Sequence, residues 1–545
     1  MSMKKGVITI YLTITFTVLL SMFFASFEAA RISAYRVVAE CAFQSAVISG
    51  FGEYHKELLK KYDVFFVDLT YQSNQASENK LAEHVSTYLN DALPVPEKRL
   101  LYANDFFGDA TASVSVSSQR HATDLFGSAF KKQATDYMKD LVSADFVNDF
   151  LSLIRVKEEY SLDEESFDSV RQRISDEEEA AGMTGPDEQG LGSDDTSSEV
   201  NVSDEEKEAD EEEIKTIRCY QDFDMEYRYF RPLELLVLKK EAANKSAKIF
   251  NPTDVPSGRL SSYKIGDLEL LQTKNSPADE IIFTEYIMQK CSNYTEEKEG
   301  GYLCYEAEYI IAGRDNDSEN LGAVMEKIYL IRTAANMLSL KKDKEKSELI
   351  DGVAEVLGAI TEIPPKVIAV VLLCMWAGGE SVYDMQELLN GERVSLIKDA
   401  DDFHLSLSGG IKAAAASNIA DSLKLEDHSH GKLLLTEEGG QAGTELSVVN
   451  DYSPNSLIGI YSGGQKNLSI DIKLSYEDYL RLLIYTVLPE IKTMRMLDVV
   501  ELSIRQTKNN ETFRMDYCVD AAVFTAVIHT SFSAEYDLKR RYSYF

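Results

Sequence analysis

The chain has 545 residues, of which 44% are hydrophobic and 10% aromatic, so it can bury a core and is not disordered as a whole. Its net charge of −35 comes from 91 acidic and 56 basic residues. A surface this acidic repels phosphate backbones, which argues against nucleic-acid binding.

The first predicted element is a transmembrane helix over residues 7–27, an uncharged stretch preceded by Lys4 and Lys5. As a helix it would be roughly 32 Å long, close to the thickness of a bilayer's hydrocarbon core. The lysines favour a cytoplasmic tail over residues 1–6, which puts the bulk of the chain outside the cell. A cleaved signal peptide is the alternative, but no pair of small residues at alternate positions marks a cleavage site between Ser21 and Ala34.

The same helix is predicted to continue outside the membrane over residues 28–62. No glycine or proline interrupts residues 7–49, and Gly50 and Gly52 are expected to loosen or end the helix. An apolar stripe at three- and four-residue spacing is expected to pack on a globular domain. Its members are Phe27, Ala30, Ala34, Val37, Cys41, Ile48 and Phe51.

Small residues mark one face of the predicted span. Ser21, Ala25, Ala29 and Ser33 are each four residues apart, a spacing that lets helix backbones approach closely in a membrane. Glu28, at the edge of the span, either marks the interface or pairs with a cation of a neighbouring subunit. We predict that these five residues pack against other helices; the alternative is that alanine is simply a good helix former.

Two α+β domains are predicted beyond this helix, with a disordered acidic linker over residues 161–213 between them. Within the linker, Asp176–Glu213 carries 17 acidic residues, one lysine and no aromatic residue. The small domain, 63–160, is read as strands at 62–70 and 111–119 and helices at 78–93 and 122–159. The second domain, 214–545, has predicted strands at 303–313, 512–518 and 521–531, and the last two are expected to form a C-terminal hairpin. Its predicted helices are at 280–294, 320–340, 344–359, 365–377, 381–389 and 475–506.

The search for catalytic groups yields only weak candidates. Glu380 and Asp384 lie one helical turn apart beside Trp376, as an acid–base pair or as ordinary acids on a helix surface. His428 and His430 could share a metal, but no third ligand is marked. We therefore predict no enzyme activity and no cofactor.

Two further patterns have structural explanations that we prefer. Residues 315–326 place acids at positions 1, 3, 5 and 12 of a calcium loop, but Asn320 occupies the position that requires glycine, and an acidic helix start explains the same residues. Cys291 and Cys304 flank a turn-rich stretch and are read as buried thiols, with a disulfide as the alternative.

Several stretches, including "GVITIYL", "FEAARISAYRVVAE", "EYHKELLKKYDVFFVD", "NLGAVMEKIYLIRTAANM" and "WAGGESVYDMQELLNGERVSLIK", resemble an uncharacterised family of single-pass membrane proteins of Gram-positive bacteria. That family is associated with Tad/Flp pilus assembly and has TadE/TadG-like, pseudopilin-like N-termini. The resemblance implies no active site. The sequence departs from a prepilin processing site, because the fifth residue after Gly6 is Tyr11 where glutamate is expected.

These observations lead to one functional hypothesis and two alternatives. We expect a non-enzymatic, membrane-anchored extracellular component of a pilus or surface secretion assembly, whose N-terminal helix docks with other assembly proteins. The alternatives are a membrane-tethered exported hydrolase and a ligand-binding or adhesive ectodomain.

Overall fold

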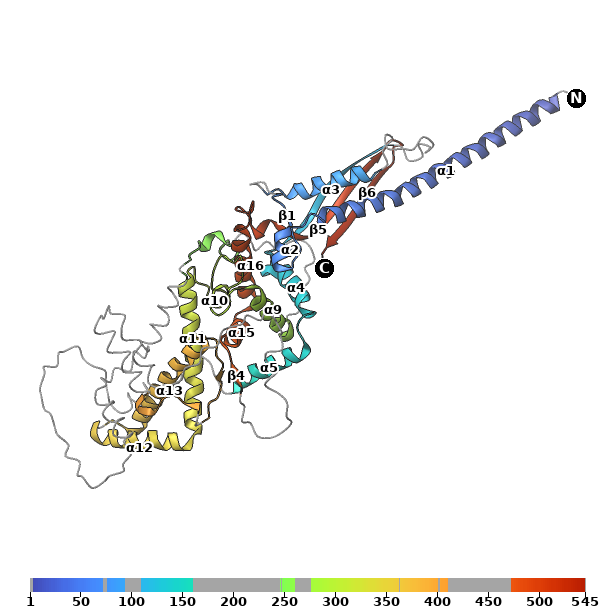
Figure 1. The fold of residues 1–545 in the computed structure, drawn as a ribbon. Helices are drawn as coiled ribbons and strands as arrows, with labels where there is room; N and C mark the ends of the chain where they lie inside the picture. Colours follow the sequence, from blue (N-terminus) through green and yellow to red (C-terminus); the bar gives the residue numbers. More distant parts are fainter. Residues whose placement is uncertain are drawn as a thin grey trace, which may run out of the picture. The chain divides into compact units, whose positions relative to one another are not determined.

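The computed structural model describes residues 3–71, 76–93, 109–159, 246, 248–259, 276–361, 363–399, 402–409 and 472–544 (Figure 1). They form two compact units. The first contains the described parts of Met1–Tyr137, Pro252–Asn275 and Pro489–Phe545, and the second those of Met138–Asn251 and Ser276–Leu488. Helices dominate and antiparallel strands accompany them, which confirms the predicted α+β class. The predicted acidic linker, 161–213, lies outside the described residues.

The first unit combines helices with a four-stranded sheet. Its helices are α1 (Met3–Phe51), α2 (Lys56–Tyr62), α3 (Glu78–Ala92), α4 (Asp124–Lys139, whose last two residues belong to the second unit), η3 (Pro252–Asp254), η4 (Pro256–Gly258), α16 (Pro489–Arg505) and η8 (Met515–Tyr517). Its strands are β1 (Val67–Asp68), β2 (Ala110–His121), β5 (Cys518–Thr530) and β6 (Glu535–Ser543).

The sheet is antiparallel throughout, and β5 is its central strand. β2 pairs with β5 from Ala110↔Thr530 to His121↔Val519, β6 pairs with β5 from Ala521↔Ser543 to His529↔Glu535, and β1 pairs with its first two residues. A buried ion pair fixes these strands, because the Arg120 guanidinium on β2 donates to both carboxylate oxygens of Asp520 on β5 and to Ser543 on β6. The C-terminal strands therefore pair with a strand from residues 63–160, a division of the chain that differs from the predicted linear boundaries.

One face of the sheet is covered by α1 and α3, which lie side by side along it (Figure 1). The core between them contains Tyr35, Phe43 and Phe51 of α1 together with Phe524 of β5. α1 ends at Phe51 and does not continue to residue 62 as predicted, since Lys56–Tyr62 is the separate helix α2. The Gly52 amide donates to the Ile48 carbonyl at 2.9 Å, as the two predicted glycine signals indicate.

The predicted apolar stripe of α1 is wrong as an account of which face packs on the domain. Val37 and Ile48 are 62% and 49% exposed, and Ala30, Ala34 and Cys41 are exposed as well. Of the predicted stripe, Phe51 is buried as expected. The rest of the buried face is formed by other residues, Tyr35, Ala39, Ala42, Phe43, Ala46 and Val47. The prediction failed because α1 is apolar on two faces beyond residue 34, and spacing alone does not say which of them meets the core.

The second unit is mainly helical. Its elements are α5 (Ala144–Glu159), α9 (Pro277–Lys290), α10 (Glu306–Ala312), α11 (Asp317–Lys342), α12 (Lys344–Thr361), α13 (Pro365–Leu389), β3 (Val394–Ser395), β4 (Lys473–Leu474) and α15 (Tyr476–Thr486). α11, α12 and α13 enclose an apolar core that includes Leu357, Leu372 and Trp376. The two short strands pair with each other, Val394 opposite Leu474.

Five predicted elements of the chain differ from the structure. The strand at 62–70 is only β1, because residue 62 ends α2. The helix at 122–159 is two helices, α4 and α5. The strand at 303–313 is a loop followed by α10, because a short apolar run fits a buried helix as well as a strand, and Gly313 ends that helix at φ 69°. The helix at 475–506 is two helices, since Pro489 begins α16 instead of kinking one long helix. In the C-terminal hairpin, residues 512–517 are a loop and η8, Cys518 begins β5, and the hairpin partner of β5 is the charged strand β6.

Candidate functional site

The N-terminal half of α1 is the most unusual surface of the described chain. Its large apolar side chains, from Ile10 to Phe27, are all at least 40% exposed. Two described helices, α1 and Pro365–Leu389, are long and apolar enough to span a bilayer. In the second of them, 78% of the most apolar 18-residue stretch is buried inside the protein. The first half of α1 therefore requires an apolar environment that its own unit does not supply, as a membrane anchor or a signal sequence does.

The predicted packing residues lie in and next to this exposed half. Ser21, Ala25, Ala29 and Ser33 are all exposed, and Glu28 is half-buried. Glu28 pairs with Arg31 of the same helix, at 3.6 Å. The structure thus places the small residues on accessible helix surface, and their role in helix packing stays a prediction.

α1 is attached to the sheet by an aromatic cluster where its exposed half ends. The Tyr35 ring stacks on Tyr536 with ring centroids 5.5 Å apart and meets the edge of Phe532 at 5.6 Å. The Arg31 guanidinium lies over the Phe532 ring at 4.2 Å, and the Tyr536 hydroxyl donates to the Ile32 carbonyl at 2.9 Å. Burial, with a smaller contribution from Tyr536, raises the pKa of Tyr35 to about 12. Both phenols therefore stay neutral and the junction is insensitive to physiological pH.

A second aromatic cluster holds the other end of α1. Phe51 packs against Phe524, Tyr542 and Tyr544, with ring centroids 6.0, 4.5 and 5.3 Å away. The Tyr544 hydroxyl also donates to the Phe51 carbonyl. The two clusters are 16 residues apart, or about 24 Å along the helix axis, so this part of α1 is held rigidly on the sheet. Sequence reasoning missed the C-terminal aromatic residues, although their density after residue 531 was the available signal.

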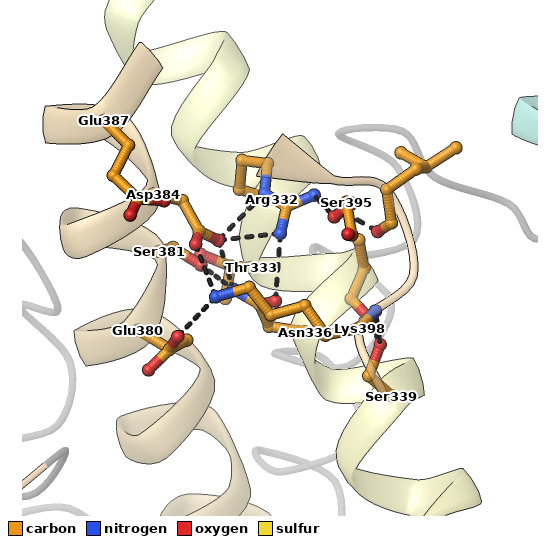
Figure 2. Close-up of polar contacts among 12 residues, drawn as sticks. Arg332, Thr333, Asn336, Ser339, Glu380, Ser381, Asp384, Glu387, Ser395 and Lys398 are labelled. Atoms are coloured by element: carbon orange, nitrogen blue, oxygen red, sulfur yellow. Dashed lines mark hydrogen bonds and ion pairs between the residues drawn. The ribbon is translucent and has the colours of Figure 1, made fainter. Parts of the chain in front are cut away.

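Glu380 and Asp384, the acids considered for catalysis, lie in a buried charge cluster of the second unit and not on a helix surface. Both side chains are fully buried on α13 and face α11 and the segment after β3 (Figure 2). Arg332 of α11 donates to Asp384 Oδ2 through Nε at 2.9 Å and Nη2 at 2.7 Å. Lys398 pairs with Glu380, and its Nζ lies 2.6 Å from Asp384 Oδ1.

Two cations and two anions therefore neutralise one another inside this cluster. Burial alone would raise the pKa of Asp384, but Arg332 and Lys398 lower it below its usual value. Glu380 also accepts hydrogen bonds from the backbone amides of His404 and Leu405, both at 3.0 Å. Each carboxylate thus binds several neighbouring groups at once, which is an arrangement suited to positioning helices.

Arg332 extends the same cluster to the loop after β3. Its Nη1 donates to the carbonyl oxygens of Ser395 at 2.8 Å and Leu396 at 3.1 Å, and the Tyr479 hydroxyl of α15 lies 3.2 Å away. Ser339 of α11 accepts from the Lys398 amide at 3.0 Å (Figure 2). The cluster joins α11, α13, α15 and the β3 segment.

The acids of the calcium-loop pattern serve as a helix start. α11 begins at Asp317, and the Asn316 side chain accepts from the Ser318 amide at 2.9 Å. Asp317 is fully buried and accepts from Ser246 Oγ at 2.6 Å and from the Cys304 amide at 2.9 Å. Among the described residues, no three His, Cys, Asp or Glu side chains are grouped to hold a metal.

The remaining candidates from the sequence are two cysteines, which the structure describes, and two histidines, which it does not. Neither Cys291 nor Cys304 forms a disulfide; Cys291 is buried as predicted, and Cys304 is half-buried. His428 and His430 lie outside the described residues.

These observations define a class of protein: an α+β protein whose apolar N-terminal helix continues along a sheet and shares a hydrophobic core with it. Residues 207–439 and 456–530, more than half of the chain, match a family of unknown function, DUF5702, and the chain belongs to this family. No curated protein and no solved structure matches the chain.

Proposed function

We propose that the chain is a non-enzymatic, membrane-anchored component of a Tad/Flp-type pilus or surface secretion assembly, with its N-terminus in the cytoplasm and both folded units outside. One observation supports the proposal above all. α1 runs without a break from a lipid-length exposed apolar segment into the core of the first unit. One continuous helix of this kind would hold the first unit at a fixed distance from the membrane, as expected of a scaffold protein in an assembly.

The second support is the row of small, exposed residues on the anchoring part of α1. Ala25 and Ala29 let another helix approach closely, and polar side chains there would block that approach. We expect Ala25→Asn with Ala29→Asn to abolish co-purification with the assembly partners while the folded units keep their melting temperature. Phe24→Asn, on a different face of the same turns, is the matched control and should leave co-purification intact.

Protease treatment of intact cells tests the orientation. Digestion should remove the folded units and leave a membrane-bound fragment that ends near Glu28. If the folded units are protected in intact cells and digested only after lysis, the outward orientation is wrong. If the alanine variants still co-purify with their partners, docking through this face is wrong.

A further inference from the structure

The face of α1 that points away from the sheet carries a second apolar row, which we call the outer stripe. Val37 and Ile48 are its largest exposed side chains. At 3.6 residues per turn, the stripe lies on the side of the helix opposite the buried row that contains Tyr35, Ala39 and Ala46. Its members are Ala30, Ala34, Val37, Cys41, Gln44 and Ile48, all exposed in the described structure.

The spacing of the outer stripe is that of a coiled coil. Successive members are four, three, four, three and four residues apart, which corresponds to alternating a and d positions of a heptad. A single-domain surface helix carries one apolar stripe, and α1 carries two. Sheet packing accounts for the buried row, so the outer stripe needs a different partner helix.

We propose that two copies of this chain pair in parallel through their outer stripes. The proposal rests on the membrane anchor of the proposed function, because two anchored copies present the same stripe in the same direction and at the same height. Val37 is ten residues beyond Phe27, about 15 Å past the predicted span, so lipid does not cover it. The stripe must then meet a protein surface, and another anchored copy offers one in register.

The polar residues agree with self-pairing. Gln44 is the one polar member of the stripe, and an amide side chain at a core position can donate to and accept from its own copy. In a parallel pair, Ser33 would flank Val38 of the other copy and Glu40 would flank Ser45, so no like charges oppose each other. Glu40 is already paired with Arg36 of the same helix, at 3.1 Å.

Cys41 provides a direct test, since it is an exposed free thiol at a core position of the stripe. Membranes containing the full-length chain are oxidised with copper phenanthroline and analysed without reductant. We expect a product at twice the 61.1 kDa chain mass that disappears on reduction and is lost in Cys41→Ser. In that background, Ala34→Cys should restore the dimer, and Ser49→Cys should not, because Ser49 is exposed but turned about 100° from Ile48.

A second measurement distinguishes failure of the dimer proposal from failure of the membrane-anchor proposal. Alkaline carbonate extraction reports whether the chain stays in the membrane, and loss of the chain to the supernatant would overturn the proposed function itself. If the chain stays in the membrane but Cys41 and Ala34→Cys give only monomer, or an adduct of another mass, pairing of two copies is wrong and the anchor stands. Val37→Asp should reduce the dimer product at least tenfold without lowering the melting temperature, because its side chain is exposed.

Discussion

At the scale of single residues, Gly50 shows why α1 and α3 can lie so close. A Cβ atom at this position would come within 2.6 Å of Val85 Cγ2 on α3, and valine is too stiff to move aside freely. We expect Gly50→Ala to destabilise the first unit by about 1–3 kcal/mol, although alanine is the better helix former. Denaturant unfolding measures the change, and adding Val85→Ala should make the Gly50→Ala step much less costly.

Gly352 of α12 provides the matched control in the second unit. Apart from the adjacent backbone of its own helix, no atom of the described residues lies within 4 Å of a Cβ built there. Gly352→Ala should therefore stabilise its unit by about 0.5–1 kcal/mol through helix propensity alone. A stabilising Gly50→Ala would show that α1 and α3 are not in close contact.

Glu308 makes the second unit sensitive to pH. Its side chain is fully buried, Oε1 accepts from the Tyr294 amide and the Tyr476 hydroxyl at 2.9 Å, and Oε2 has no hydrogen-bond partner among the described groups. Burial raises the pKa of Glu308 from 4.5 to about 7, against the smaller lowering effect of these hydrogen bonds. The folded state therefore holds a proton that the unfolded state has released between these two values.

The resulting stabilisation is present below pH 4.5 and is lost as the pH rises to about 7. Since each pKa unit corresponds to ~1.4 kcal/mol, the loss is at most about 3.5 kcal/mol. Glu308→Gln should remove this part of the pH dependence and be more stable than wild type at pH 8. The exposed Glu299→Gln serves as the control. Parallel stability–pH curves for wild type and Glu308→Gln would contradict the assignment.

At the scale of elements, the charge cluster on α13 is predicted to hold helices together and not to perform chemistry. Arg332→Met would leave Asp384 buried with one cation fewer, which typically costs about 3–5 kcal/mol. Lys344→Met, which breaks the exposed pair with Glu348, should change stability by less than about 0.5 kcal/mol. Thermal unfolding distinguishes the two, and a hydrolase would instead lose activity in Glu380→Gln with its stability intact.

The sequence predicts these elements unevenly, for identifiable reasons. The helices around 320–340 and 344–359 were predictable because their apolar spacing extends over several turns and a capping residue precedes α11. Ser475 and Asp478 form a capping box with both reciprocal hydrogen bonds, and their three-residue spacing marks the start of α15 in the sequence. The sequence reading missed β6, although charged residues alternate there with Tyr536 and Leu538 as in a half-buried strand. Only its pairing with β5 could not be read from local pattern.

The candidate sites depended even more on distant parts of the chain. The row of small residues in α1 could be identified from its four-residue spacing in the sequence. The burial of Glu380 and Asp384 was not, because their partners Arg332 and Lys398 are contributed by α11 and by the segment after β3. Likewise, only the pairing of α1 with the C-terminal hairpin decides which of its two apolar faces is buried.

At the scale of the whole molecule, the last residues of the chain hold the first helix in place. Phe532, Tyr536, Tyr542 and Tyr544 contact the two ends of the sheet-bound part of α1, and β6 supplies the strand between them. Ending the chain after Ser531 should therefore release α1 from the sheet. Amide hydrogen exchange should show lost protection in residues 35–51, while α11 and α13, which belong to the other unit, keep theirs.

A single substitution distinguishes loss of the contacts between α1 and the C-terminal aromatic residues from a general loss of folding. Tyr536→Phe removes only the hydroxyl that donates to the Ile32 carbonyl and keeps the ring stacked on Tyr35, so exchange should rise near residues 32–36 alone. Tyr536→Ala also removes the stacked ring and should extend the loss toward Ala42. If residues 35–51 stay protected in the shortened chain, α3 alone holds the helix, and the connection between the two ends of the chain has no mechanical role. If protection falls as expected, any force on the C-terminal hairpin reaches α1 directly, because the two share one core.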